Sequence, residues 1–346
     1  MLSKRLRHLA ALSGPAVLIG ALLIAAGLPA VAAPTYAETG QIAGPDGGWD
    51  YASFDPVHRR LFISRSNGLT ALDVDSGTLV GHLADGARTH EPLALPGGDQ
   101  VLLTNGATNS ALLLNAADGK LIASIPTAPF PDGAVFDTAS GLAVTGGAAG
   151  IATLIDPVAK AQVGTITIGG HLEFLASDGQ GRVFVNVESG NEIAVLDLKA
   201  KTVSARYKLD GCDSPGGLAY APSADVLIAA CDNKVAKVVA AKTGAVQATL
   251  AIGDGPDAVI YDPVRKLAFI PCGHDGVLEV IDVKGGADAV VIQTVKTEIG
   301  ARTGALDPKT GKLYLPTAKY GPPATPGGRP LSLPGTFHIV VVSPAG

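Results

Sequence analysis

The 346 residues carry 31 acidic side chains against 26 basic ones, and only 16% of the residues are charged. Three of the bases, Lys4, Arg5 and Arg7, stand at the very start, so the rest of the chain is more acidic still, with 31 acids against 23 bases. Nucleic-acid binding depends on a surface rich in Lys and Arg, so this balance argues against polyanionic partners. The 44 glycines and 24 prolines are typical of short strands joined by tight turns.

Residues 1–32 have the three parts of a secretory signal peptide: a basic start, an apolar run over 9–28 and a small-residue exit at 30–33. We expect cleavage after Ala32 or one or two residues later. The alternative is an uncleaved membrane anchor, because the apolar run is long, but Gly14 and other breakers interrupt it. The chain is therefore predicted to be periplasmic or secreted, with no membrane span after cleavage.

From residue 35 to residue 346 one pattern recurs seven times. A short segment of small residues (strand a) precedes an apolar strand b, a second apolar strand c follows, and a turn leads to an alternating strand d. Four strands per 40-odd residues predict one blade of a β-propeller. The cores of strand b, at steps of 40, 41, 41, 43, 41 and 46 residues, begin at Leu61, Val101, Leu142, Val183, Val226, Leu267 and Leu313. The prediction is a single all-β domain, a seven-bladed β-propeller of four-stranded blades.

The ring also has to close, because an open propeller leaves exposed sheet edges. The chain supplies seven a–b–c sets but only six following d strands, since it ends soon after residues 337–341. Residues 39–49 are similar to residues 249–257, which form a d strand in the pattern. The N-terminal segment is therefore predicted to supply strand d of the last blade.

Segments 261–270 and 305–315, with their Asp-Pro turns and following apolar strands, resemble the YVTN repeat of YncE-like propellers. The resemblance covers essentially all of 35–346, although Tyr-Val-Thr-Asn itself is replaced by partial matches such as Val185-Asn186. It implies a seven-bladed fold in a periplasmic or surface protein. For function it implies less: some relatives are linked to ligand or nucleic-acid binding, and related seven-bladed propellers include lactonases.

Counting five residues back from the Asp-Pro position of each blade gives the residue that enters the axial channel. These residues share one face, here called the top face, with the d–a and b–c loops. They are Asp50, His90 (beside Glu91), Asp132, Glu173 (two after His171), Gly216, Asp257 and Arg302.

Carboxylates and imidazoles that converge on one opening suit a divalent metal ion, and Arg302 could orient an anionic group. The metal-ligand candidates are His90, His171, Glu173 and Asp257. The alternative is a water-filled polar mouth whose acids only bind loop amides.

The last blade inserts the Pro- and Gly-rich residues 317–336 between strands b and c. By the topology this insertion lies on the top face, where it could overhang the mouth. The alternative is a surface loop that only covers the closing blade.

Cys212 and Cys231 are predicted to form a disulfide, because one lies in a d–a loop and the other ends strand b of the following blade, both on the top face. Closing about 20 residues would contribute about 3 kcal/mol. Cys231 and Cys272 occupy equivalent places in adjacent blades and are too far apart to pair. Cys272 is expected to be free and half-buried.

We therefore expect a monomeric, non-enzymatic exported propeller that binds a small polar ligand, a metal ion or a protein segment at the top mouth. One alternative is a lactonase-type hydrolase or lyase, in which a metal ion held by these acids would polarise a carbonyl and activate water. Another is a scaffold that engages partner proteins through its blades. The sequence contains no P-loop and no G-x-S-x-G elbow.

Overall fold

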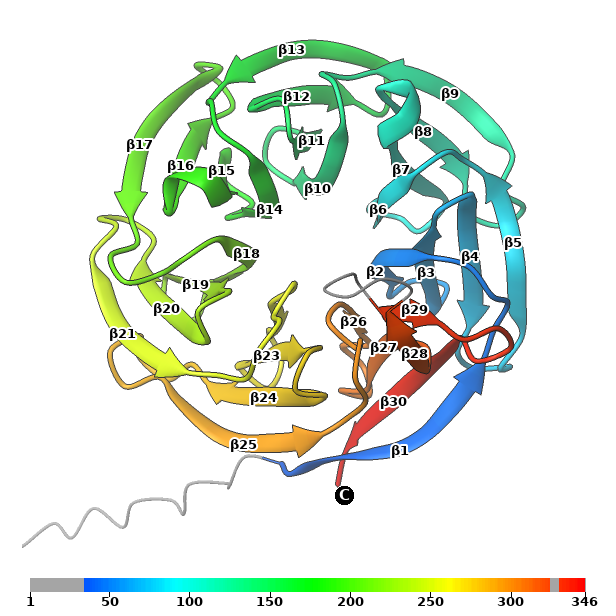
Figure 1. Cartoon of the computed structure of the whole chain (residues 1–346). Helices are drawn as coiled ribbons and strands as arrows, with labels where there is room; N and C mark the ends of the chain where they lie inside the picture. Colours follow the sequence, from blue (N-terminus) through cyan, green and yellow to red (C-terminus); the bar gives the residue numbers. More distant parts are fainter. Residues whose placement is uncertain (1–33, 324–329, 346) are drawn as a thin grey trace, which may run out of the picture. The chain divides into compact units, whose positions relative to one another are not determined.

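The computed structural model describes residues 34–323 and 330–345. They belong to one compact unit, Ala33–Gly346, whose strands form seven four-stranded antiparallel sheets arranged in a ring (Figure 1). The predicted seven-bladed β-propeller is thus confirmed. The predicted signal peptide lies outside the described residues.

Blades 1 to 6 each take their strands a, b, c and d in chain order, from the axis outward. Blades 1 to 3 are β2(Trp49–Asp55), β3(Arg60–Arg65), β4(Gly68–Asp73), β5(Leu79–Asp85); β6(Thr89–Ala94), β7(Gln100–Asn105), β8(Ser110–Asn115), β9(Leu121–Pro126); and β10(Pro131–Asp137), β11(Leu142–Gly147), β12(Ile151–Asp156), β13(Ala161–Thr167). Blades 4 to 6 are β14(Leu172–Ser177), β15(Arg182–Val187), β16(Glu192–Asp197), β17(Thr202–Lys208); β18(Pro215–Ala221), β19(Val226–Cys231), β20(Val235–Ala240), β21(Val246–Ala251); and β22(Ile260–Asp262), β23(Leu267–Cys272), β24(Val277–Asp282), β25(Val290–Lys296).

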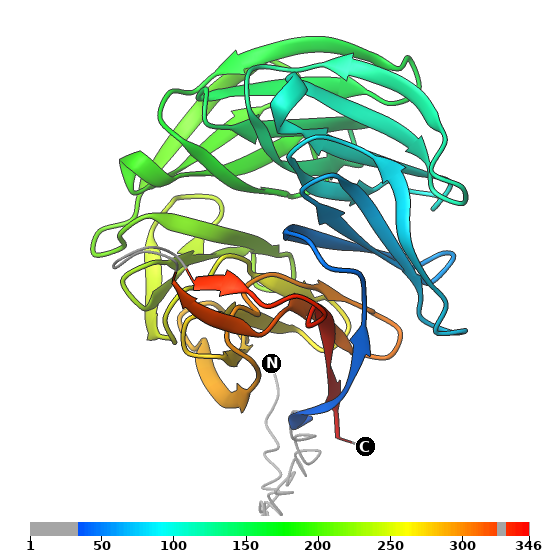
Figure 2. The same cartoon turned by 45° about the vertical axis from the view of Figure 1, so that its right-hand side comes forward.

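Blade 7 is assembled from both ends of the chain. Its order is β26(Ala305–Leu306), β27(Leu313–Thr317), β30(His338–Pro344) and β1(Tyr36–Ala43). β1 pairs antiparallel with β30, and Figure 2 shows the two strands side by side. The N-terminal segment therefore supplies strand d of the last blade, as predicted, although the strand begins three residues before the expected segment 39–49 and ends at Ala43.

The apolar b and c strands are buried because each blade packs on both of its neighbours. Seven clusters of buried apolar residues lie between adjacent blades. The cluster between blades 1 and 7, for example, joins Leu61 and Ile63 to Tyr314 and Ile339. The d strands face solvent on one side and alternate accordingly. The core is thus a ring of interfaces between blades.

Two short 3-10 turns interrupt b–c loops: η1(Gly106–Thr108) in blade 2 and η2(Glu188–Gly190) in blade 4. The insertion of blade 7 folds into a two-stranded hairpin, β28(Tyr320–Pro323) with β29(Pro330–Ser332). Within 34–323 and 330–345, no helix is long and apolar enough to cross a membrane.

Candidate binding site at the axial mouth

A β-bulge near the start of strand a positions the axial residues. In blades 1 to 5 the pairing of strands a and b shifts register by one residue at the same place, so two successive residues oppose one partner. In blade 6 the isolated bridge between Pro256 and Cys272 stands at the equivalent position. The shifts lie between Trp49 and Ala52, Thr89 and Pro92, Pro131 and Ala134, Leu172 and Leu175, and Pro215 and Leu218. In blades 1 to 6 every residue predicted by counting back is the first residue of its bulge or the equivalent position, and Arg302 of blade 7 precedes the short strand β26.

The main chain at these bulges is held by buried polar side chains. Thr104 Oγ1 accepts a hydrogen bond from the amide of Glu91 (2.8 Å) and donates one to the carbonyl of Asp132 (2.7 Å). Thr303 Oγ1 donates to the carbonyl of Asp50 at 2.7 Å. Both contacts to a carbonyl connect neighbouring blades: Thr104 of blade 2 bonds the bulge of blade 3, and Thr303 of blade 7 bonds the bulge of blade 1. Hydrogen bonds between blades thus hold the main chain from which the site residues project.

Asp50, His90 and Asp132 converge from blades 1, 2 and 3. His90 Nδ1 lies 2.7 Å from Asp50 Oδ2 and 3.5 Å from Asp132 Oδ1. One ligand atom from each of the three residues lies within 4.8 Å of the other two, so the cluster could hold a metal ion. Glu91, the second bulge residue of blade 2, is 5% exposed.

His171 and Glu173 belong to a second cluster of this kind, completed by Glu188 from η2. His171 Nδ1 lies 2.5 Å from Glu188 Oε2 and 3.6 Å from Glu173 Oε1. Glu188 was not predicted, because the counting rule locates residues of strand a and Glu188 lies in a b–c loop. The signal was available: Glu188 directly follows strand b, on the same top face.

Asp257 and Arg302 form an ion pair, with Arg302 Nε 2.7 Å from Asp257 Oδ2 and Arg302 Nη2 3.5 Å from Asp50 Oδ1. Asp257, a metal-ligand candidate from the sequence, is not part of either metal-capable cluster found among the described residues. Burial lowers the pKa of Arg302, but the attraction of Asp257 and Asp50 outweighs it and the pKa is raised. Arg302 is thus a charged group already shared between two carboxylates.

Burial of several acids around one opening raises the pKa values of their carboxyl groups. The pKa of Glu173 rises to about 9, first through burial and then through repulsion from Asp132 and Asp257. Burial also raises the pKa of Asp132 to about 6, against the attraction of His90. Glu91 has a pKa well above the usual range for the same reasons, burial first. The mouth therefore favours protons or cations.

Two aromatic rings meet below the acids, one residue further from the top face. Tyr51 of blade 1 and Phe174 of blade 4 pack edge to face with their ring centroids 5.2 Å apart. Each is the second residue of its bulge. Tyr51 is 4% exposed, and burial together with the surrounding acids raises its pKa. The pair places aromatic surface next to the axial acids.

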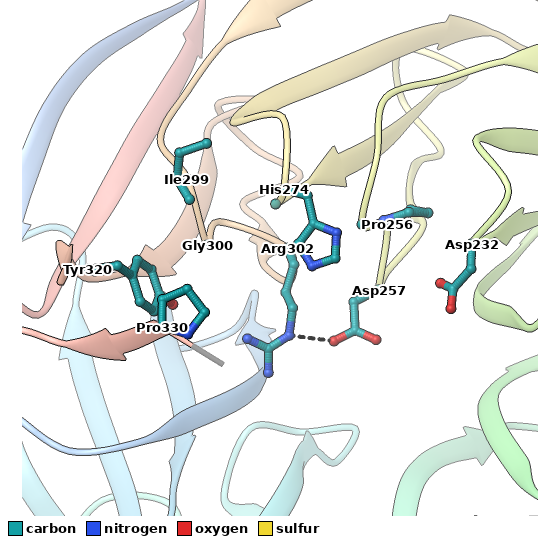
Figure 3. A pocket seen from close by; sticks show the side chains of 11 residues that line it. Asp232, Pro256, Asp257, His274, Ile299, Gly300, Arg302, Tyr320 and Pro330 are labelled. Atoms are coloured by element: carbon teal, nitrogen blue, oxygen red, sulfur yellow. Dashed lines mark hydrogen bonds and ion pairs between the residues drawn. The ribbon is translucent and has the colours of Figure 1, made fainter. Parts of the chain in front are cut away.

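A cavity of about 600 Å³ opens beside the mouth, between blades 5, 6 and 7. Figure 3 shows Asp257 and Arg302 on one side of it and Tyr320 and Pro330, from the inserted hairpin, on the other. Its other lining side chains include Asp232, His274 and Ile299. The insertion therefore forms one wall of the cavity.

Asp232 and His274 were not predicted, although a clear signal marks them. They follow Cys231 and Cys272, which end the b strands of blades 5 and 6, so both lie in b–c loops. The amide of Asp232 donates to the carbonyl of Asp213 at 2.8 Å, and the amide of His274 donates to the carbonyl of Asp254 at 3.1 Å. These bonds connect each b–c loop to the preceding d–a loop and fix the cavity wall.

Cys212 and Cys231, the predicted pair, form the disulfide found in the structure, with their Cα atoms 5.4 Å apart. It ties the d–a loop before blade 5 to the strand end that carries Asp232. Cys272 is free but fully buried rather than half-buried. It packs in the apolar cluster between blades 5 and 6, and burial raises the pKa of its thiol to about 12. Cys272 is therefore a core residue.

No protein-family model matches the chain, and no curated protein matches it in sequence. Among solved structures, Kuenenia stuttgartiensis hydrazine synthase is similar with a TM-score of 0.68 and 16% identity over 81% of this chain and 94% of that one. A chain in a crystal structure of the mitotic checkpoint complex is similar with a TM-score of 0.74 and 12% identity over 97% of this chain and 100% of that one. Identities this low show the shared fold alone, which is the β-propeller.

Proposed function

We propose that this protein is an exported binding propeller, similar to the YncE-like proteins, that takes a small polar ligand in the cavity between blades 5, 6 and 7. The observation that carries the proposal is the cavity itself, whose volume of about 600 Å³ lies within the range of about 300–1,000 Å³ for small-molecule sites. It combines apolar walls with a few converging polar groups, which is the usual composition of such sites.

The charges around the cavity favour a ligand that donates hydrogen bonds or carries positive charge. Asp232 and Asp257 both line it, and burial raises the pKa of each carboxyl group. Arg302 is already paired with Asp257 and lies near Asp50. An anion placed next to Arg302 would therefore also meet two carboxylates. An amine or a donor-rich alcohol would bind the acids without that repulsion.

The disulfide between Cys212 and Cys231 supports the export part of the proposal, because disulfides persist in oxidising compartments. The signal-peptide features of residues 1–32 point the same way.

The test uses three probes with the same four-carbon skeleton: butane-1,4-diamine, butane-1,4-diol and succinate. Each is titrated into the purified protein by calorimetry at low, fixed ionic strength. We expect the diamine to bind most tightly, the diol more weakly and succinate least. Asp232→Asn and Asp257→Asn should each weaken diamine binding about 10-fold, the size of one charge-assisted hydrogen bond.

Ile299→Trp is a second variant, which fills the cavity from its wall without changing a charge. It should weaken the diamine and the diol alike. The matched control is Asp85→Asn, which removes an almost fully exposed carboxylate far from the cavity. Tighter binding of succinate than of the diamine would contradict the charge argument, and equal binding to wild type and Ile299→Trp would contradict the site.

A further inference from the structure

Asp50, His90 and Asp132 lie outside the cavity assigned to the ligand, because neither His90 nor Asp132 lines it. Their side chains are 17% to 23% exposed, so the cluster is mostly withdrawn from solvent. One imidazole nitrogen of His90 faces the carboxylates of Asp50 and Asp132. Arg302 Nη2 lies 3.5 Å from Asp50 Oδ1 and balances part of this negative charge, but among the described residues His90 is the only basic side chain that forms an ion pair with Asp132.

One buried oxygen at this cluster lacks a hydrogen-bond partner, and a buried acid directly follows His90 in the chain. Asp132 Oδ1 is buried and accepts no hydrogen bond from any described residue. Glu91 is 5% exposed; its amide donates to Thr104, and its carboxylate forms no hydrogen bond or ion pair with another side chain among the described residues. Burial, with repulsion from Asp50 and Asp132, raises the pKa of its carboxyl group. Buried polar groups are costly without partners, and a bound cation would supply one.

The main chain around the cluster is preorganised. The carbonyls of Asp50 and Asp132 and the amide of Glu91 are held by the threonine hydroxyls described above. Gly106 leaves space for the other edge of the imidazole, since a Cβ there would lie 3.0 Å from His90 Nε2. Nδ1 is therefore the nitrogen that faces the carboxylates. A recess of about 140 Å³, lined by Trp49, Asp50 and His90 among others, leads to the cluster.

We propose that Asp50, His90 and Asp132 bind one divalent transition-metal ion, preferentially Zn²⁺. The site goes beyond the proposed function and does not depend on it. Imidazole with carboxylates suits Zn²⁺ and related ions, whereas Ca²⁺ needs six to eight oxygens. Three protein ligands leave a position open toward the recess, as in zinc sites that keep a water ligand.

The geometry needs only a small adjustment. Ligands about 2.0–2.1 Å from a tetrahedral Zn²⁺ lie about 3.4 Å apart. His90 Nδ1 and Asp132 Oδ1 are already 3.5 Å apart, and Asp50 Oδ2 at 2.7 Å has to move back slightly. The ion takes the place of any proton on His90 Nδ1, which is released to solvent.

The cluster of His171, Glu173 and Glu188 serves as an internal comparison. It is more open, with His171 38% and Glu188 32% exposed, and none of its side-chain atoms is among the buried, unpartnered ones of the described residues. We therefore place the tighter ion in the first cluster.

The experiment is a competition titration of the chelator-treated full-length protein with Zn²⁺ and a chromophoric zinc indicator. We expect one tight Zn²⁺ per chain, and Mg²⁺ and Ca²⁺ should compete poorly. His90→Gln and Asp132→Asn should each lower zinc affinity at least 100-fold. Bound Co²⁺ should give visible absorption bands in the wild type that both variants lose.

His82→Gln is the matched control, because His82 forms a similar 2.8 Å contact with Asp85 on the exposed surface without a third ligand. It should leave zinc affinity unchanged. Circular dichroism verifies that each variant is folded, and Asp50→Asn gives a third independent ligand test. The proposal is overturned if no tight Zn²⁺ binds, if Ca²⁺ binds as tightly, or if His171→Gln rather than His90→Gln abolishes binding.

Discussion

At the scale of single residues, the surroundings of a buried carboxylate decide its charge. Asp307 is fully buried, and burial alone would raise its pKa. Two hydrogen bonds from the Arg59 guanidinium, at 3.0 and 2.9 Å, and one from Thr310 outweigh burial and hold the pKa low. Glu173, also mostly withdrawn from solvent, has other acids around it instead, and its pKa rises to about 9. The first acid stabilises the fold and the second belongs to the mouth.

Glu173→Gln should therefore stabilise the protein, and the gain should grow with pH. Below the ordinary pKa of 4.5 the carboxyl group is protonated in both the folded and the unfolded chain and contributes nothing. Between 4.5 and about 9 only the unfolded chain ionises readily, so stability falls as pH rises. Glutamine does not titrate and removes this loss.

We expect equal melting temperatures for wild type and Glu173→Gln near pH 4.5 and a gain of at least about 1 kcal/mol for the variant by pH 8. Thermal unfolding in the presence of a chelator measures it. The exposed Glu38 gives the control Glu38→Gln, which should show no such trend. A constant difference at all pH values would mean that the gain does not come from ionisation of Glu173.

At the scale of elements, the β-bulge is the feature that builds the mouth. Its first residue could be predicted, because in the three blades with an Asp-Pro turn the axial residue stands five residues before the Asp, and the blade spacing carries this position to the other four. The bulge itself could not be predicted, because it depends on the register in which strand a pairs with strand b. Glu188, Asp232 and His274 follow the ends of b strands, a position that the sequence reveals, but which of these loop residues reach the site depends on loop hydrogen bonds such as those of Asp232 and His274.

Thr104→Val tests whether the hydroxyl group holds the bulge. It leaves the amide of Glu91 and the carbonyl of Asp132 without their partner, and an unpaired buried polar group costs about 1–3 kcal/mol. We expect a loss of about 2–4 kcal/mol in the free energy of unfolding, measured by chemical denaturation. Thr104→Ser should recover most of it.

Thr70→Val is the matched control for Thr104→Val. Thr70 is equally buried, but its hydroxyl makes one hydrogen bond, to the carbonyl of Gly81 at 2.7 Å. Its loss should be about half as large. If the two valine variants lost the same stability, the hydroxyl of Thr104 would have no special role at the bulge.

At the scale of the whole molecule, the ring is held by interfaces between blades and closed by β1. The number of blades and the closing strand followed from counting strands in the sequence. The contacts that stabilise this closure could not be predicted from the sequence, because they join residues far apart in the chain. Tyr36 packs edge to face on Phe269 of blade 6 with ring centroids 4.9 Å apart. The side chain of Gln293 bonds both the amide and the carbonyl of Tyr36, at 2.8 and 2.7 Å.

Tyr36→Ala should loosen the closure. The side chain is 2% exposed, and truncating a buried aromatic residue costs about 3–5 kcal/mol. Hydrogen exchange of the β30 amides should accelerate more than that of blade 3, because β30 would lose its outer partner first. Leu121→Ala, on the exposed side of a d strand, is the control. Uniform acceleration in all blades would show that the ring opens as one unit rather than at its joint.

Because β1 pairs with β30, the ring can close only after the last strand has been synthesised. Synthesis produces β1 before any other strand of the ring and β30 after all of them, whereas blades 1 to 6 each pair strands that are neighbours in the chain. Six blades can assemble as they emerge, while the earliest strand stays single until the last one arrives. A chain that stops before β30 leaves β1 unpaired and exposes an open sheet edge. Proteases and chaperones recognise surfaces of this kind. Once β30 has been synthesised, it pairs with β1 and covers this edge.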